Sequence, residues 1–265
     1  MDARDYKRKK ANRIAVLILI IFLLLCLLGG VGYLFFHWYG GYAAEQSYES
    51  LMDFADEIIN EAEKDEEENL AENPIDFASL KAKNEDVYAW INIPNTKINY
   101  PVVQSKVDDN FYLNRSIDKK YLFAGMIYSQ SCNSLDFFDP VTVLYGHNMK
   151  NGTMFQNLHK YQDAKFFDEN DEFYVYTENR IFTYKVISAF KYDNRHIMNS
   201  YDFNDIEQLT EFQNTVLNPG GFIKNVRSGV ELNEYSKILV LSTCINDRRS
   251  RYLVCGVMTG DEKTK

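Results

Sequence analysis

The sequence has 265 residues, of which 29 are basic and 38 are acidic, and its formal net charge is −9. The charges are unevenly distributed. Residues 1–13 contain six basic and two acidic side chains, so the remaining chain carries a net charge of −13. Phosphate repels such an acidic chain, which argues against a nucleic-acid partner. The length suits one domain of moderate size with appendages.

Residues 14–36 form an uncharged, mostly apolar segment that predicts a single transmembrane anchor. About 20 apolar residues suffice to cross a bilayer, whereas a cleaved signal peptide has a shorter apolar region. Because basic side chains dominate residues 1–13, the positive-inside bias predicts that these residues form a cytoplasmic tail. We therefore expect a single-pass protein of the cell membrane, with the chain beyond the anchor outside the cell.

Residues 41–85 are acidic and are predicted to be mainly helical. One apolar stripe recurs at helical spacing and consists of Leu51, Phe54, Ile58 and Ala62. The stripe favours a helix that packs on the following domain over a free spacer.

From residue 86 onward the pattern predicts a mainly β fold. About eight apolar segments rich in β-branched and aromatic residues are separated by polar loops. They do not alternate regularly with helices, which favours an antiparallel barrel or sandwich over a parallel sheet. One helix is predicted within this region, at residues 204–217, with Asn204 as its N-cap and Glu207 completing a capping box. Its apolar face comprises Ile206, Leu209, Phe212 and Val216.

The segment ILVLSTC predicts a buried strand, Ile238–Cys244, that ends on a thiol. Such a cysteine is either a small core residue or a nucleophile held at the rim of a cleft. The cysteines beyond the anchor are Cys132, Cys244 and Cys255, and their number and spacing suggest neither a disulfide framework nor a zinc site. We therefore expect no metal and no other cofactor.

Two further residues are predicted to lie near this thiol. His147 directly follows the apolar run VTVLYG, so it also stands at the end of a predicted strand. Arg251 opens the next strand, seven residues after Cys244, and antiparallel pairing would bring its guanidinium close to the thiol. A guanidinium donates several hydrogen bonds to a developing oxyanion. The sequence predicts only solvated surface positions for His159 and His196, which lie in polar segments.

These residues resemble a known signature. VLSTC, with Arg251 opening the next strand and YGHNM upstream, resembles the motifs of sortases, the membrane-anchored cysteine transpeptidases of Gram-positive bacteria. The resemblance covers roughly residues 86–258 and includes WINIPNTKINYPVVQ, NFYLN and AGMIY. It implies a catalytic domain at residues 86–260 that folds as a closed eight-stranded β-barrel, with a helix inserted between strands 6 and 7. The LSTC form and this helix are most similar to class B sortases.

The resemblance also implies roles for single residues. Cys244 would attack the threonine carbonyl of a sorting signal and form a thioacyl-enzyme, with His147 as general acid and then base. Arg251 would hold the oxyanion. Arg249, two residues earlier, would point to the same face of the strand and is the competing candidate. The residues expected to line the peptide groove are Leu113, Ser242 and Thr243. Class B membership implies an NPxTN-like signal on a surface protein, and an acceptor amine on a peptidoglycan precursor or a pilin.

Two alternatives remain open on the sequence. A chymotrypsin-like cysteine protease also places a histidine before a cysteine on β-strands, but its nucleophile usually lies in a Gly-x-Cys-Gly turn, which Cys244 lacks. A non-catalytic anchored binding module would need none of the histidine, cysteine and arginine in these places.

Overall fold

The computed structural model describes residues 24, 27–35, 39, 42, 46, 52, 70–245 and 249–265. The predicted cytoplasmic tail, most of the predicted anchor and the apolar stripe of the acidic region therefore lie outside the described residues. No helix among the described residues is long and apolar enough to cross a membrane. The chain divides into two compact units, Met1–Ala44 and Glu45–Lys265. In the first unit, residues 27–35 are helical.

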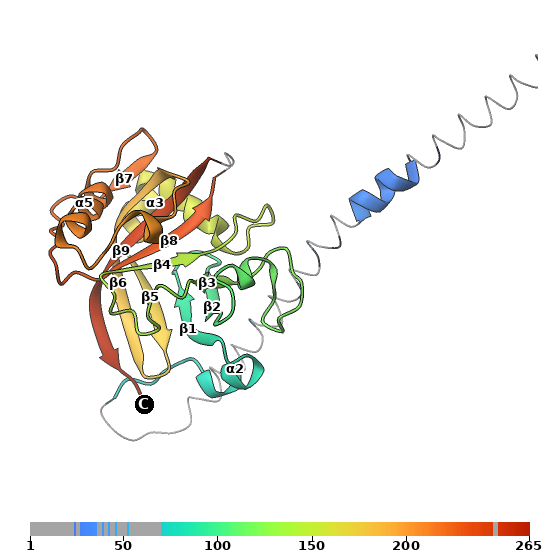
Figure 1. The fold of residues 1–265 in the computed structure, drawn as a ribbon, viewed down its shortest axis with the longest axis horizontal. Coiled ribbons are helices and arrows are strands. Elements are labelled where there is room, and N and C mark those ends of the chain that lie inside the picture. Colours follow the sequence, from blue (N-terminus) through green and yellow to red (C-terminus); the bar gives the residue numbers. More distant parts are fainter. Residues whose placement is uncertain are drawn as a thin grey trace, which may run out of the picture. The chain divides into compact units, whose positions relative to one another are not determined.

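The second unit is built around one β-sheet (Figure 1). Its strands are β1 (Val87–Asn92), β2 (Asn99–Gln104), β3 (Ile127–Ser129), β4 (Val141–Tyr145), β5 (Glu172–Thr177), β6 (Arg180–Asp193), β7 (Lys224–Val226), β8 (Ile238–Cys244) and β9 (Ser250–Lys263). Its α-helices are α2 (Phe77–Lys83), α3 (Ala164–Glu169), α4 (Ile197–Ser200) and α5 (Ile206–Leu217). The described residues also form two 3₁₀ helices, η1 (Phe111–Asn114) and η2 (Phe155–Gln162).

The sheet closes on itself as an eight-stranded barrel. Its strand order is β5-β1-β2-β3-β4-β8-β9-β6, and β6 pairs with β5 to complete the ring. The short strand β7 pairs with β6 outside this ring. This confirms the predicted closed barrel, and α5 lies in the connection between β6 and β8, the sixth and seventh barrel strands.

The expected antiparallel pairing is right for most neighbours and wrong for two. Strands β2 and β3 are parallel, and so are β4 and β8. Parallel neighbours need a long connection, and nearly a hundred residues separate β4 from β8 in the chain. Such a pairing has no local signal in the sequence.

Helix α5 covers the outside of the barrel with its apolar face. Leu209, Phe212 and Val216 are buried in a cluster that includes residues of β4, β6, β8 and β9. Ile206 was also expected on this face, but as the first residue of the helix it is 50% exposed. The predicted N-cap is wrong by one residue, because Asp205 rather than Asn204 accepts a hydrogen bond from the backbone N–H of Glu207.

Candidate active site

Cys244 is the last residue of β8, and its position explains why an apolar strand ends on a thiol. The six residues before it, from Ile238 to Thr243, are buried, whereas Cys244 is exposed. Strand β8 pairs with β4 on one side and with β9 on the other. The barrel thus anchors the strand and presents the thiol at its rim.

Arg251 lies directly opposite Cys244. The two residues are register partners in the antiparallel β8–β9 ladder, as the sequence predicts. On the other side of β9, Arg251 pairs with Tyr192 of β6. Because ladders flank the arginine on both sides, its backbone is held firmly next to the nucleophile. Arg249 is exposed and lies before β9 begins.

His147 reaches the same edge of the barrel from β4. Because β4 and β8 run parallel and Tyr145 pairs with Ser242, both strands end side by side. The Nε2 atom of His147 lies 2.7 Å from the backbone carbonyl oxygen of Leu113, and the ring stacks on Phe123 with centroids 5.6 Å apart. An N–H must donate to that carbonyl, which leaves Nδ1 as the basic nitrogen. Burial lowers the pKa of His147.

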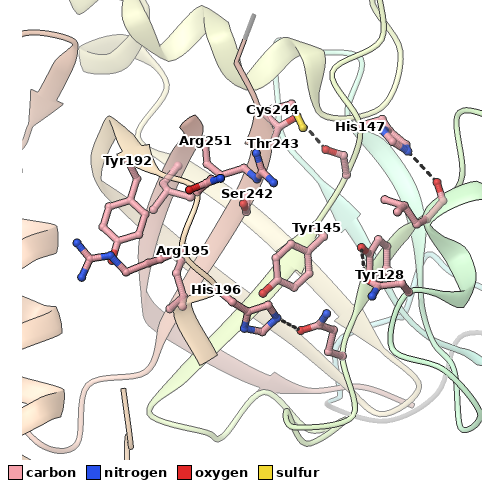
Figure 2. Close-up of a pocket in the computed structure, with 17 residues that line it drawn as sticks. Tyr128, Tyr145, His147, Tyr192, Arg195, His196, Ser242, Thr243, Cys244 and Arg251 are labelled. Carbon is pink, nitrogen blue, oxygen red and sulfur yellow. Dashed lines mark hydrogen bonds between the residues drawn. The ribbon is translucent and has the colours of Figure 1, made fainter. Parts of the chain in front are cut away.

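These side chains surround one cavity of about 220 Å³ (Figure 2). Its lining includes all six residues that the sequence singled out, namely Leu113, His147, Ser242, Thr243, Cys244 and Arg251. Their separation along the chain exceeds 130 residues, and the barrel alone brings them together. Among the described residues, no group of three His, Cys, Asp or Glu side chains could hold a metal ion.

The three residues expected in the peptide groove differ in exposure. Leu113, on η1, is 40% exposed and is open to a ligand. Ser242 is buried at the cavity wall. Thr243 is only 2% exposed, and its hydroxyl donates to the carbonyl of Gly146 at 2.8 Å. The Thr243 side chain therefore links β8 to the chain after β4, although the residue lines the cavity.

Three aromatic side chains also line the cavity, and the sequence analysis did not identify them. Tyr128 and Tyr145 stack with ring centroids 5.5 Å apart, and Tyr192 lines the same space (Figure 2). The hydroxyl of Tyr145 is buried and has no hydrogen-bond partner among the described residues. These tyrosines lie on three strands, so only the closed barrel places them together.

The expectation of solvated histidines at His159 and His196 is wrong. His196 is half-buried in the cavity lining, and its Nε2 lies 2.6 Å from Oε1 of Gln130. His159 lies on η2, and its Nε2 is 3.1 Å from the carbonyl oxygen of Cys244. Burial lowers the pKa of His159. Both contacts join residues more than sixty positions apart, so no local pattern could have predicted them.

Comparison with known proteins agrees with this architecture. Residues 91–259 match the sequence model of the sortase domain family. Sortase B of Listeria monocytogenes is 31% identical over 179 residues, which cover 65% of this chain and 68% of the relative.

Solved structures give the same result. The X-ray structure of Clostridium perfringens sortase B is 30% identical and has a TM-score of 0.61; the match covers 70% of this chain and all of that one. The crystal structure of sortase B from Bacillus anthracis in complex with AAEK1 is 27% identical and has a TM-score of 0.66, over 81% of this chain and 98% of that one. The chain therefore belongs to the sortase family of cysteine transpeptidases and is similar to its class B members.

Proposed function

We propose that this sortase cleaves an NPxTN-like sorting signal after its threonine and transfers the new carboxyl end to an amine. The observation that carries the proposal is the convergence of Cys244, His147 and Arg251 on one cavity, with the thiol and the guanidinium in register on adjacent strands. A chymotrypsin-like protease and a non-catalytic binding module are not favoured by this arrangement or by the family.

In the first half of the reaction, Cys244 forms a thioester with the threonine. The half-buried His147 is neutral at rest, because its pKa is lowered, and it takes the proton of the Cys244 thiol as sulfur attacks the carbonyl carbon. The tetrahedral intermediate then expels the amine of the scissile bond. His147 returns the proton to that amine, so the carbon–nitrogen bond breaks and a carbon–sulfur bond remains.

In the second half, an incoming amine attacks the thioester. His147 removes a proton from the amine as it adds, and the Cys244 sulfur leaves and regains a proton. A new amide bond is formed and the enzyme returns to its starting state. The Arg251 guanidinium donates hydrogen bonds to the oxyanion in both halves, where negative charge develops on the former carbonyl oxygen.

The substrate peptide lies in the cavity between η1 and the ends of β4 and β8. Leu113 offers an exposed apolar contact to the peptide, and Tyr145 contributes to the aromatic lining of the cavity. Ser242 contributes the wall next to the nucleophile. The backbone of Thr243 contributes to the same wall, while its hydroxyl stays bound to Gly146.

The biological setting follows from the family and the N-terminal sequence. The substrate is a surface protein, and the acceptor is an amine of a peptidoglycan precursor or a pilin. Residues 14–36 anchor the enzyme as a single-pass membrane protein, with residues 1–13 in the cytoplasm and the barrel outside the cell.

Peptide turnover tests the proposal. NPQTN- and LPETG-type peptides are incubated with the enzyme, with and without a small amine, and the products are identified by mass spectrometry. We expect cleavage after threonine with a preference for NPQTN, and a ligated product only when the amine is present. Equal turnover of both peptides would refute the NPxTN preference, and cleavage without any ligation would refute the transfer step.

A further inference from the structure

Among the described residues, the end of β8 has no neighbouring strand on the side of β4. The β4–β8 ladder stops at the pair Tyr145–Ser242, two residues before the thiol. Beyond this pair the backbone N–H of Gly146 still donates to the carbonyl of Ser242 at 3.1 Å, and the chain then turns away. Side chains take over from the ladder, beginning with the Thr243 hydroxyl that donates to the Gly146 carbonyl.

The carbonyl oxygen of Cys244 accepts two side-chain hydrogen bonds. One comes from Nδ2 of Asn148, at 3.0 Å, and the other from Nε2 of His159, at 3.1 Å. Asn148 directly follows His147 in the chain. Its bond therefore ties the peptide group of the nucleophile to the segment that carries the general acid and base.

His159 is itself held in place from two directions. Its ring stacks on Tyr252, with centroids 5.0 Å apart, and Tyr252 pairs with Thr243 in the β8–β9 ladder. Its Nδ1 lies 2.8 Å from Nε2 of Gln162. In the neutral ring Nδ1 accepts from this amide, and the Nε2–H donates to the Cys244 carbonyl. Both nitrogens are thus occupied, so the ring serves as a fixed donor rather than a second base.

We propose that Asn148 and His159 are positioning residues that fix the peptide group of Cys244 and thereby set the thiol against His147 and Arg251. The proposal rests on the nucleophilic role proposed for Cys244. Reacting groups must be held to within about 0.5 Å, and a small displacement of the nucleophile slows the chemical step more than it weakens substrate binding. Because the β4–β8 ladder ends at Ser242, these two donors supply the restraint on this side of Cys244.

Substitutions in the full chain, in detergent, separate the hydrogen bond from the packing. His159→Phe keeps a ring on Tyr252 but has no donor, whereas His159→Gln keeps a donor and loses the ring. We expect kcat to fall about tenfold in His159→Phe and in Asn148→Ala, with KM nearly unchanged, and His159→Gln to recover most of the rate. Lys160→Ala, an exposed neighbour on η2, is the control and should stay near wild type.

Hydrogen–deuterium exchange gives a readout that needs no substrate. In His159→Phe, the peptide that covers Leu241 to Ile245 should exchange about tenfold faster, because the strand end opens more often. Faster exchange without a change in kcat would overturn the proposal, because His159 would then stabilise the strand end without affecting catalysis. A lower kcat without faster exchange would overturn it too. Wild-type chain that turns over no sorting peptide would instead count against the proposed function, and the exchange result would still decide whether the strand end is held.

Discussion

At the scale of single residues, the three cysteines outside the predicted anchor differ sharply in their environment. Burial raises the pKa of Cys255 to about 12, and burial together with Asp109 raises the pKa of Cys132. Both thiols are therefore poor sources of thiolate at neutral pH, although Cys132 is exposed. Cys244 alone among them lies beside both a histidine and an arginine.

We expect Cys244→Ala to abolish both cleavage and transfer while leaving the fold intact, because no other described thiol borders the cavity. Peptide turnover and circular dichroism measure the two effects. In the wild type, iodoacetamide at neutral pH should label Cys244 faster than Cys132. Turnover near the wild-type level in Cys244→Ala would place the nucleophile elsewhere, with Cys132 as the next candidate.

The register of Arg251 permits a test of geometry against charge. Arg251→Lys keeps the positive charge but loses the planar, multi-donor group, so it should be nearly as damaging as Arg251→Ala. Loss of one oxyanion donor costs about 10²- to 10³-fold in kcat, and KM should change little because the contact strengthens as charge develops.

Arg249→Ala is the matched control and should be mild, because Arg249 precedes β9, whereas Arg251 lies directly opposite Cys244 in the β8–β9 ladder. Steady-state kinetics of the three variants distinguish the outcomes. If the kcat of Arg251→Lys were within a few-fold of the wild-type value, Arg251 would contribute only a local positive charge. If kcat fell severely in Arg249→Ala and only mildly in Arg251→Ala, the oxyanion role would belong to Arg249 instead of Arg251.

Much of the candidate site could be predicted from sequence, because each main residue stands at the end of an apolar run. His147 follows β4, Cys244 ends β8 and Arg251 opens β9, and the short connection between β8 and β9 made their pairing predictable. The contacts of His159 and His196 could not be predicted. They depend on the parallel pairing of distant strands and on the path of η2 over the barrel end.

At the scale of elements, the chain directly after β4 decides where the histidine stands. Gly146 lies between Tyr145 and His147, and a Cβ there would lie 2.5 Å from Cδ1 of Ile127 and 2.7 Å from the ring of Phe155. Both neighbours are fully buried, so the chain would have to shift.

We expect Gly146→Ala to lower the free energy of unfolding by about 1–3 kcal/mol through overpacking and to reduce kcat by displacing His147. Denaturant unfolding and peptide turnover measure the two effects. Gly220→Ala is the control, since nothing lies within 4 Å of the added Cβ. If Gly146→Ala had the stability and kcat of the wild type, the neighbouring side chains would accommodate a Cβ at this turn and the prediction would be wrong.

The elements themselves were predictable to different degrees. The eight barrel strands and α5 follow from apolar runs and helical periodicity, which are local properties of the sequence. The short strand β7 carries no apolar run, since Lys224 and Val226 are exposed and Asn225 is half-buried. It forms only because β6 offers a free edge there, and that edge is a property of the assembled barrel.

At the scale of the whole molecule, two half-buried histidines couple stability to pH. Burial lowers the pKa of His147 and of His159 below that of an unfolded chain, about 6.5. Below that pH the unfolded state binds these protons more readily than the folded state does. Their contribution to stability is therefore present above about pH 6.5 and is lost as pH falls through the folded pKa values.

We expect the melting temperature to fall between pH 7.5 and pH 5, and the fall to be smaller in His159→Gln, which has no titrating group at this position. Thermal unfolding monitored by circular dichroism across this range checks both statements. A melting temperature that rises on acidification would contradict this account of the two histidines. So would a double variant at His147 and His159 whose melting temperature changes with pH as steeply as that of the wild type. Carboxylates such as Asp193, whose pKa Arg195 lowers, act at lower pH.

The unit Glu45–Lys265 contains the whole barrel and every residue that lines the cavity. A protein that lacks residues 1–40 should therefore stay folded, with the melting temperature and peptide turnover of the full chain in detergent.

The peptide turnover of this truncated protein should also be unchanged by EDTA, because the described residues offer no cluster of three metal-binding side chains. Turnover with EDTA, and again after adding calcium, is the direct measurement. Activity lost to EDTA and restored by calcium would reveal a metal site that involves residues outside the described part of the chain. A requirement for calcium would also be more typical of class A than of class B.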